Sequence, residues 1–319
     1  DFARKAAGFH KIVYITIAQS RIGFWRDFFM IWFSWGLRHR IVCHLHGGNY
    51  DTFYHEQPAW VQGLIRATLL RSHALLVLGE RLKRMYDFEP RLASRVQVVS
   101  NGLPFEIPNP VLLKQLPAEN EGPIHILFLS NLIESKGYFD VLEAVRILAR
   151  DFRLPVKGHF CGAFKPCAAD DRRVKNVEQA REMADEYVRA NGLSESVMFH
   201  GVVTGEEKLR LLEQAHFFVL PTRYSNEGQP VSIIEAIAYA TVVVATDYRA
   251  IPDMVLDGVT GALVPYGEPR IIAEKIRDLV ANPARYGEMS RAARQHFVAG
   301  FTQESHLNRL IERILRNPE

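Results

Sequence analysis

Short apolar runs alternate with amphipathic segments along most of the 319 residues, and this alternation constrains the fold more than any other feature. The runs have the length of buried strands, whereas the segments repeat apolar residues at helical spacing. Strands that alternate with helices usually pair in parallel. The expected strands are 11–18, 40–46, 74–78, 96–99, 124–129, 156–161, 197–199, 217–220 and 242–246, and the expected helices are 138–150, 177–191, 206–215, 231–240, 268–281 and 303–316. We therefore expect an α/β protein with parallel sheets.

A proline-rich stretch divides this pattern in two. Residues 104–123 contain five prolines and no long apolar period, which is typical of a linker, so we place a domain boundary near 115–122. Residues 1–115 carry 15 Lys+Arg and 8 Asp+Glu, a net charge of +7, whereas residues 116–319 carry 24 and 28, a net charge of −4. The first domain is therefore basic and the second is mildly acidic.

Residues 226–240, NEGQPVSIIEAIAYA, contain two glutamates, Glu227 and Glu235, that are separated by seven residues. An expected strand precedes the segment, and a helix is expected to begin after Pro230. The free N–H groups and the dipole of such a helix start favour a phosphate. Glu235 lies among apolar residues, where an unpaired carboxylate would be costly, and the hydroxyl pair of a ligand would satisfy it.

Two further candidates, His46 and Lys136, follow expected strands, as Glu227 does. Taken alone, His46 would be a hydrogen-bonded core histidine, and Lys136 and Glu227 would be solvated side chains. Ligands of open α/β sheets bind beyond the carboxyl ends of the strands, however. The shared position of these three residues therefore favours a binding site.

These stretches resemble the family-4 retaining glycosyltransferases (glycosyltransferase group 1), which share an E-x7-E signature and the GT-B fold. The resemblance extends to HILFLSNLIESKGYFDVLEAV at 125–145, ATDYRAIPDMVLDGVTGALVP at 245–265, CHLHGGNY at 43–50 and VVSNGLP at 98–104. It implies two Rossmann-like domains with parallel sheets facing across a cleft. Residues 1–118 would form the acceptor-side domain, with helix 303–317 packing back on it, and residues 119–302 would form the nucleotide-sugar domain.

The resemblance also implies an activity. A hexose would move from a nucleoside diphosphate sugar to an acceptor hydroxyl with retention of the anomeric configuration, in bacterial polysaccharide or glycolipid synthesis. The implied catalytic residues are His46, Lys136 and Glu227, and the implied donor-binding residues are Gly47, Gly48, Asn131, Arg223, Gly228, Gln229, Pro230, Val231 and Glu235. No cofactor is expected, and no metal either, because the chain has no Asp-x-Asp motif to hold one beside the phosphate.

The sequence departs from the family in two places. Many members have an arginine a few residues before the lysine, whereas this chain has Ser130 and Asn131. Asn131 can hydrogen-bond a phosphate but cannot neutralise it, so Arg223 is a candidate substitute. The family's first strand and Gly-rich loop are also not found before Lys11. Either the sequence lacks a segment that precedes it naturally or the first domain is reduced, and we expect the former.

Residues 21–40, RIGFWRDFFMIWFSWGLRHR, combine three tryptophans and four phenylalanines with arginines. They could form an amphipathic helix on a membrane surface or an ordinary helix packed on a sheet. Because apolar residues occupy nearly every position from Phe28 to Trp35, we expect a buried helix. The basic first domain would still favour an anionic acceptor, such as a lipid pyrophosphate near an anionic leaflet.

Other interpretations of the chain remain open. The main alternative is a catalytically silent GT-B protein that binds nucleotide sugar or membrane lipid as a scaffold; another is a relative that epimerises or cleaves a nucleotide sugar. A dinucleotide oxidoreductase is disfavoured, since no G-x-G-x-x-G follows a strand. The expected partners are a nucleotide-sugar donor, a glycan or lipid-linked acceptor and an anionic membrane surface, and no nucleic acid.

The cysteines bear on the location of the protein. An odd number of cysteines, three, argues against a disulfide framework. Cys161 and Cys167 with His159 could be a metal-binding fragment, but no second pair follows at ligand spacing, so buried free thiols are expected. We therefore expect a cytoplasmic protein, peripheral at the inner face of the plasma membrane. No apolar run reaches transmembrane length.

Overall fold

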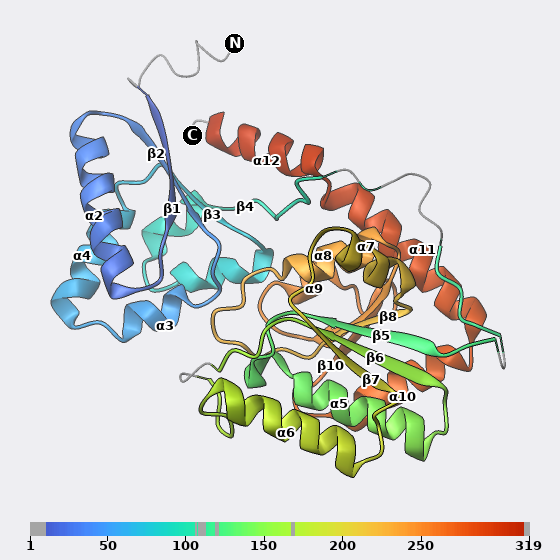
Figure 1. Cartoon of the computed structure of the whole chain (residues 1–319). Coiled ribbons are helices and arrows are strands. Elements are labelled where there is room, and N and C mark those ends of the chain that lie inside the picture. Colours follow the sequence, from blue (N-terminus) through green and yellow to red (C-terminus); the bar gives the residue numbers. More distant parts are fainter. Residues whose placement is uncertain (1–10, 106, 108–112, 119–120, 167–169, 316–319) are drawn as a thin grey trace. The chain divides into compact units, whose positions relative to one another are not determined.

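The computed structural model describes residues 11–105, 107, 113–118, 121–166 and 170–315. The chain forms two compact units (Figure 1). Unit 1 comprises Asp1–Pro104, Ser225–Gln229 and Gly300–Glu319, and unit 2 comprises Phe105–Tyr224 and Pro230–Ala299. These units differ from the expected domains over residues 105–118, 225–229 and 300–302.

Unit 1 is built on a parallel four-stranded sheet in the order β1-β2-β3-β4. Its strands are β1 (Ile12–Ile17), β2 (Arg40–Leu45), β3 (Ala74–Val77) and β4 (Val96–Val98), and its helices are α2 (Arg21–Gly36), α3 (Tyr50–His55), α4 (Ala59–Leu69), the 3₁₀ helices η1 (Glu80–Tyr86) and η2 (Pro90–Arg95), and α12 (Gln303–Leu315). Leu310 and Ile314 of α12 pack against a core formed by Val42, Ala74, Leu76 and Val99. Helix α2 lies against β1, β2 and α4.

Unit 2 contains a parallel six-stranded sheet in the order β10-β9-β8-β5-β6-β7. Its strands are β5 (Ile124–Leu129), β6 (Val156–Cys161), β7 (Val197–Gly201), β8 (Phe217–Leu220), β9 (Val242–Thr246) and β10 (Gly261–Val264). Its helices are η3 (Glu134–Lys136), α5 (Tyr138–Arg146), the π-helical η4 (Ile147–Asp151), α6 (Val177–Ala190), α7 (Gly205–Gln214), α8 (Val231–Ala238), α9 (Ile251–Met254), α10 (Pro269–Val280) and α11 (Pro283–Gly300).

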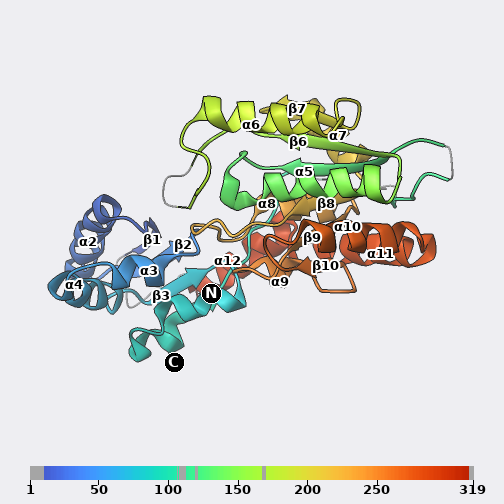
Figure 2. The same cartoon turned by 90° about the horizontal axis from the view of Figure 1, so that it is seen from below.

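The strand order of unit 2 reverses between β5 and β8. From β5 the chain continues outward to β6 and β7, and from β8 it continues in the opposite direction to β9 and β10 (Figure 2). Crossovers that run in opposite directions lie on opposite faces of a sheet. The loops that follow β5 and β8 therefore diverge and leave a crevice at the carboxyl ends of these two strands. This crevice is the position at which such folds bind ligands.

The expected strands and helices are confirmed where the alternation is strong. Strands β1 to β9 and helices α5, α6, α7, α8, α10 and α12 lie within two residues of most expected limits. The sequence analysis did not predict β10 or the helices α3, α4, α9 and α11. Strand β10 is short and begins with Gly261, and Gly287 and Gly300 weaken the helical pattern of α11.

The expectation that residues 21–40 form a buried helix is wrong in part. Helix α2 forms as expected, with Ser20 accepting a hydrogen bond from the N–H of Gly23 at its start. The helix buries only Phe24, Asp27, Ile31 and Ser34. The other large apolar side chains of the helix are mostly exposed. One face of α2 packs on the sheet, and no further layer of the described chain buries the opposite face.

Two other expectations can be compared with the structure. Cys161 is a buried free thiol, as expected, and Cys167 lies outside the described residues. Cys43 is also buried and free. None of the described helices is long and apolar enough to cross a membrane.

Candidate functional site

The loops that follow β5 and β8 meet at the switch point of the unit 2 sheet. The backbone N–H of Arg223 donates to the carbonyl oxygen of Ser135 at 2.7 Å. Gly137 has φ +80° and lies so close to Pro221 that a Cβ at this position would clash with the proline carbonyl. A glycine is therefore needed here for the two loops to approach each other.

Lys136 lies in this crevice, at the end of η3. Its Nζ is 5.1 Å from the ring centroid of Tyr224, which follows β8. The preceding Glu134 is buried and accepts hydrogen bonds from the backbone N–H groups of Arg172 at 3.0 Å and Arg173 at 2.8 Å, and from the Arg173 guanidinium at 3.0 Å. This carboxylate therefore anchors the loop that carries Lys136.

The environment of Glu134 keeps it ionised. Burial raises the pKa of the carboxyl group, but the hydrogen bonds from Arg173 outweigh burial, and the pKa lies below its usual range. The sequence analysis did not single out Glu134. Only its partners in residues 172–174 distinguish it from an ordinary loop glutamate, and they are almost forty residues away in the sequence.

Helix α8 begins at the end of the loop that follows β8. Pro230 is its N-cap residue, and no side chain caps its first N–H groups. Val231 is 44% exposed, whereas the side chains from Ile233 to Ala238 are buried. The helix therefore presents a free, partly accessible N-terminus at the end of a parallel strand, which is a favourable place for an anion.

Glu235 is buried, as expected, but it is not unpaired. Its Oε1 lies 2.7 Å from Nζ of Lys208, which projects from α7. The argument that a ligand must satisfy this carboxylate is therefore wrong, because the lysine already pairs with it. The sequence analysis missed Lys208, since nothing in a polar helical segment such as 205–214 marks one lysine as the partner of a glutamate 27 residues later.

The expected residues His46, Gly47, Gly48, Glu227, Gly228 and Gln229 belong to unit 1. The segment Ser225–Gln229 packs there, next to the carboxyl end of β2. Gly228 lies against the carbonyl oxygen of His46, so closely that a Cβ would clash with it. The structure thus brings the loop after Glu227 to the strand end that carries His46.

Two hydrogen-bonding pairs fix this segment in place. Gln19 donates from Nε2 to Oδ1 of Asn226 at 2.7 Å. Asn101 donates from its backbone N–H to Oε1 of Gln229, also at 2.7 Å. The sequence analysis named Gln229 but neither Gln19, Asn101 nor Asn226. The pairs join residues that are more than 120 positions apart, so no local pattern could have found them.

Neighbouring residues of unit 1 surround the expected residues at the carboxyl end of β2. Glu227 is buried. The ring of His46 lies 4.3 Å from that of His44, and burial, followed by nearby His306, lowers the pKa of His46. The space that Gly47 leaves is filled by the side chain of Gln19, which also accepts a hydrogen bond from the N–H of Asn49.

Arg223 and Asn131 occupy different surroundings in unit 2. The guanidinium of Arg223 lies 4.6 Å from the ring centroid of Tyr266, and a hydrogen bond to Tyr266 raises the pKa of this arginine. Asn131 is exposed, in the loop after β5. Arg223 is therefore held by an aromatic partner and is more than a solubilising side chain.

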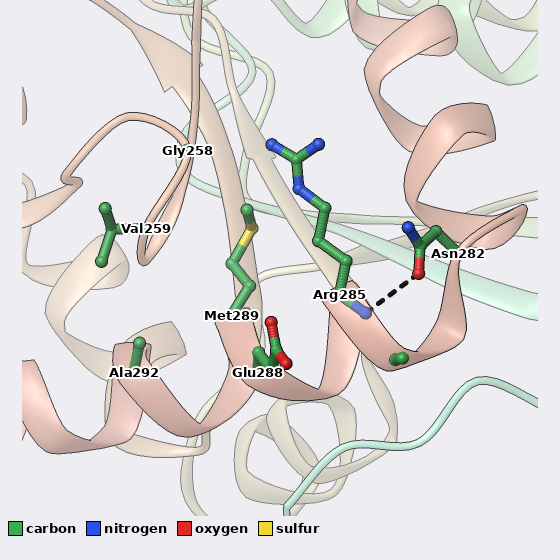
Figure 3. A pocket seen from close by; sticks show the side chains of 8 residues that line it. Gly258, Val259, Asn282, Arg285, Glu288, Met289 and Ala292 are labelled. Carbon is green, nitrogen blue, oxygen red and sulfur yellow. Dashed lines mark hydrogen bonds between the residues drawn. The ribbon is translucent and has the colours of Figure 1, made fainter.

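Among the cavities of unit 2, one includes the expected residue Arg223 and another lies away from the expected residues. One, of about 540 Å³, lies at the carboxyl ends of β8, β9 and β10 and is lined by Thr222, Arg223, Thr246, Asp247, Tyr248, Asp257, Leu263, Val264, Pro265 and Tyr266. The other, of about 570 Å³, lies between α11 and the turn that precedes β10 (Figure 3). Figure 3 shows that this second cavity is lined by Arg285, Glu288 and Met289, and it holds none of the expected residues. Among the described residues there is no group of three or more His, Cys, Asp or Glu that could hold a metal ion.

Comparison with protein families gives a match to the model for "Glycosyl transferases group 1" over residues 113–296. The match covers more than half of the chain and includes Lys136, Arg223 and both glutamates of the 227–235 segment.

Curated relatives and solved structures agree with this match. The chain is 28% identical to the α-maltose-1-phosphate synthase of Mycobacterium tuberculosis over 276 residues, which cover 80% of this chain and 64% of that protein. It is 26% identical to the putative colanic acid biosynthesis glycosyltransferase WcaL of Escherichia coli over 250 residues, or 75% of this chain and 55% of WcaL. The chain thus spans less than two thirds of each.

Among solved structures, HepE of Anabaena in complex with UDP superposes with a TM-score of 0.73 and 14% identity, over 97% of this chain and 79% of HepE. Such a likeness concerns the fold. Together with the two parallel sheets it confirms the expected GT-B class.

Proposed function

The chain belongs to the group 1 glycosyl transferases, and from this premise we propose that it transfers a hexose from a nucleoside diphosphate sugar to an acceptor hydroxyl with retention of configuration. The acceptor is a glycan or a lipid-linked glycan of a bacterial polysaccharide or glycolipid pathway. The family relationship to enzymes such as WcaL supports this pathway class. The donor class is supported by HepE, whose structures hold UDP and UDP-glucose.

One observation carries the proposal. A lysine and the uncapped start of a helix lie at the carboxyl ends of adjacent parallel strands, β5 and β8, where the strand order reverses. Such a position suits a diphosphate, because the lysine supplies a charge and the helix supplies N–H donors. The rigid approach of the two loops at Gly137 and Pro221 fixes this arrangement before a ligand binds.

In the proposed reaction the bond between the anomeric carbon and the diphosphate oxygen breaks, and negative charge develops on the leaving diphosphate. Lys136 and the N–H groups at the start of α8 stabilise this charge. Asn131 hydrogen-bonds a phosphate oxygen without neutralising it, and Arg223 supplies a second positive charge nearby. Electrostatic stabilisation of the leaving group is the largest catalytic contribution in this scheme.

The other residues bind the rest of the donor. Glu235 accepts hydrogen bonds from the ribose hydroxyls, and the pair with Lys208 orients this carboxylate. Glu227 and His46 contact the transferred sugar. Gly47, Gly48 and the segment Gly228–Val231 bring backbone N–H groups close to it. No residue of this set acts as a covalent nucleophile, and the proton of the acceptor passes to the departing phosphate.

A screen of thermal stability with donor nucleotides tests the binding step. The purified chain is measured with UDP, GDP and ADP and with their sugar conjugates, next to Glu235→Gln and a control variant of an exposed carboxylate of α6, Glu182→Gln. A saturating ligand is expected to stabilise the protein by about 2–4 kcal/mol. The shift should be smaller in Glu235→Gln and unchanged in the control.

A transfer assay tests the catalytic step. ¹H NMR of the early product gives the anomeric configuration, which we expect to equal that of the donor. Donor binding without transfer or hydrolysis would instead support a silent scaffold. Equal rates with and without EDTA are expected if, as proposed, no metal takes part.

The proposed location of the protein is the cytoplasm, at the inner face of the plasma membrane. Fractionation of cells that produce the protein tests this location.

A further inference from the structure

Helix α2 of unit 1 exposes a continuous apolar face. Ile22, Phe29 and Phe33 are 87%, 66% and 71% exposed. The exposed apolar side chains of the helix and of the residue that follows it are Ile22, Trp25, Phe29, Met30, Phe33, Trp35 and Leu37. Most of them recur three or four positions apart, so they form one stripe along the helix. Exposed apolar surface of this extent in a soluble unit marks an interaction site.

Contacts on the buried side of α2 fix which side of the helix is exposed. Asp27 is buried and accepts a hydrogen bond from the N–H of Ala18 at 2.7 Å and another from Arg26. Ser34 is buried on the same side. A rotation of α2 that buried the phenylalanines would break these bonds and expose the partners of Asp27. The helix is therefore anchored through its buried side, which includes Phe24, Asp27, Ile31 and Ser34, and its aromatic stripe is exposed.

Helix α4 extends this face. Trp60, at its start, is 64% exposed, and its ring centroid lies 6.3 Å from that of Trp25. Trp32 donates from Nε1 to Oγ1 of Thr68 at 3.0 Å, which ties the two helices together. Figure 1 shows α2 and α4 side by side. We call the six exposed apolar side chains of α2, together with Leu37 and Trp60, the aromatic face.

The charges around the aromatic face are positive. Arg21, Arg26 and Arg38 are exposed, and the only acidic residue of α2, Asp27, is buried. Residues 11–75 carry seven Lys+Arg and three Asp+Glu. The guanidinium of Arg71 also lies 3.4 Å from the ring centroid of Trp32 and 4.6 Å from that of Trp35. Aromatic rings with flanking arginines are suited to the headgroup region of an anionic bilayer.

A second copy of this chain fits the face less well. In a twofold dimer the same surface would meet itself, so the arginines of one copy would approach those of the other. A bilayer with anionic lipids offers phosphates to the arginines and acyl chains to the aromatic rings at once. With 16 residues, α2 is too short to span a bilayer, so it would lie in the interface plane.

We propose that the aromatic face of α2 and α4 binds the surface of an anionic phospholipid bilayer, with Ile22, Phe29 and Phe33 inserted below the headgroups. This surface is separate from the donor-binding residues. The inference therefore stands or falls independently of the proposed transferase activity.

The intrinsic fluorescence of the chain provides a direct test, because all four tryptophans, Trp25, Trp32, Trp35 and Trp60, belong to α2 and α4. The full chain is titrated with vesicles of phosphatidylcholine alone and of phosphatidylcholine mixed with phosphatidylglycerol. We expect a blue shift of the emission and quenching by brominated acyl chains with the anionic vesicles only. Co-sedimentation with the same vesicles measures the affinity.

A double variant that combines Phe29→Ser with Phe33→Ser removes two of the most exposed apolar side chains of α2. Loss of each inserted phenylalanine should weaken vesicle binding about tenfold, so the double variant should bind about a hundredfold more weakly. The matched control is Val177→Ser with Val298→Ser, which removes exposed apolar side chains from α6 and α11 of unit 2. Circular dichroism checks that both proteins are folded, and the control should bind like the unchanged chain.

Three outcomes would overturn the proposal. The unchanged chain could fail to bind anionic vesicles, it could bind neutral and anionic vesicles equally, or the double variant could bind as tightly as the control. Light scattering of the same proteins measures their molar mass and so tests whether a second copy of the chain covers the aromatic face instead. A dimer that the double variant loses, without any vesicle binding, would assign the aromatic face to contact between copies.

Discussion

Helices α8 and α2 are both rich in apolar residues, yet the structure uses them in opposite ways. In α8 the side chains from Ile233 to Ala238 are buried, Glu235 included. In α2 four side chains are buried, two of them polar, and most of the aromatic ones are exposed. The difference lies in the layers around each helix. Helix α8 packs on β8 and β9 and is also contacted by Lys208 of α7 and Arg294 of α11. Helix α2 packs on β1, β2 and α4 and leaves its other face exposed.

This comparison shows that apolar content alone does not predict whether a helix is buried on all sides. Nearly continuous apolar residues are typical of a helix buried all round, and this reasoning holds for α8 but not for α2. An apolar surface that stays exposed in the folded unit has to be explained by a partner, whereas a buried one is explained by stability. The two helices therefore serve different purposes, and the following experiments test that distinction.

The largest difference is expected in stability. Ile237→Ala removes a fully buried side chain of α8 and should lower the free energy of unfolding by about 2–5 kcal/mol, since a cavity remains. Phe33→Ala in α2 should change it by no more than about 0.5 kcal/mol, because the ring is mostly exposed. Urea unfolding of both variants measures the contrast. Similar losses would show that the α2 face is covered in solution.

A comparable effect is expected on catalysis at the crevice beside α8. Lys136→Met removes the charge proposed to stabilise the leaving diphosphate and should lower the transfer rate about 100-fold to 1000-fold with little change in stability. Lys275→Met, which changes an exposed lysine of α10, is the matched control. An equal rate in Lys136→Met and the control would remove Lys136 from the mechanism.

The buried interior of unit 2 should also make the protein sensitive to acid. Burial, followed by the neighbours His125 and His200, lowers the pKa of His159 to about 4 from its ordinary 6.5. Because the folded state keeps this histidine neutral, its stabilising contribution is complete above pH 6.5 and is lost as the pH falls toward 4. His159 alone should account for a loss of about 2 kcal/mol in the free energy of unfolding between about pH 7 and pH 5.

His159→Gln tests this assignment, because glutamine cannot take up the proton. Urea unfolding at both pH values should show a smaller acid loss in this variant than in His55→Gln, which replaces an exposed histidine of α3. An identical pH dependence in the two variants would exclude His159 as the source.

The smallest expected effect concerns the ion pair of α7 and α8. Lys208→Met leaves Glu235 without its partner at 2.7 Å. The lysine side chain is 26% exposed, so solvent screens the pair and the coupling should be about 1 kcal/mol. A double-mutant cycle with Glu235→Gln measures it through urea unfolding. Strictly additive effects would show that the pair contributes nothing to stability, and Glu235 would then depend on a ligand after all.

Much of the candidate site could be predicted because it follows strand ends. Lys136 and the start of α8 were found from apolar runs and from a proline, both of which are local signals. The residues that hold them in place were not found. Glu134 binds the backbone of residues 172–174, and Lys208 binds Glu235. These partners are distant in the sequence, and single polar residues in loops and on helix surfaces carry no signal of their own.

The amino-acid sequence by itself determined the alternation of strands and helices, the parallel sheets, the candidate binding residues after strand ends and the family. These features depend on periodicity and on short motifs, which act over a few residues. Only the tertiary structure decided that Ser225–Gln229 packs with unit 1, that Lys208 pairs with Glu235 and that α2 shows its aromatic stripe to the outside. Periodicity defines the faces of an element, but the neighbours that cover each face are set by packing between residues far apart in the chain.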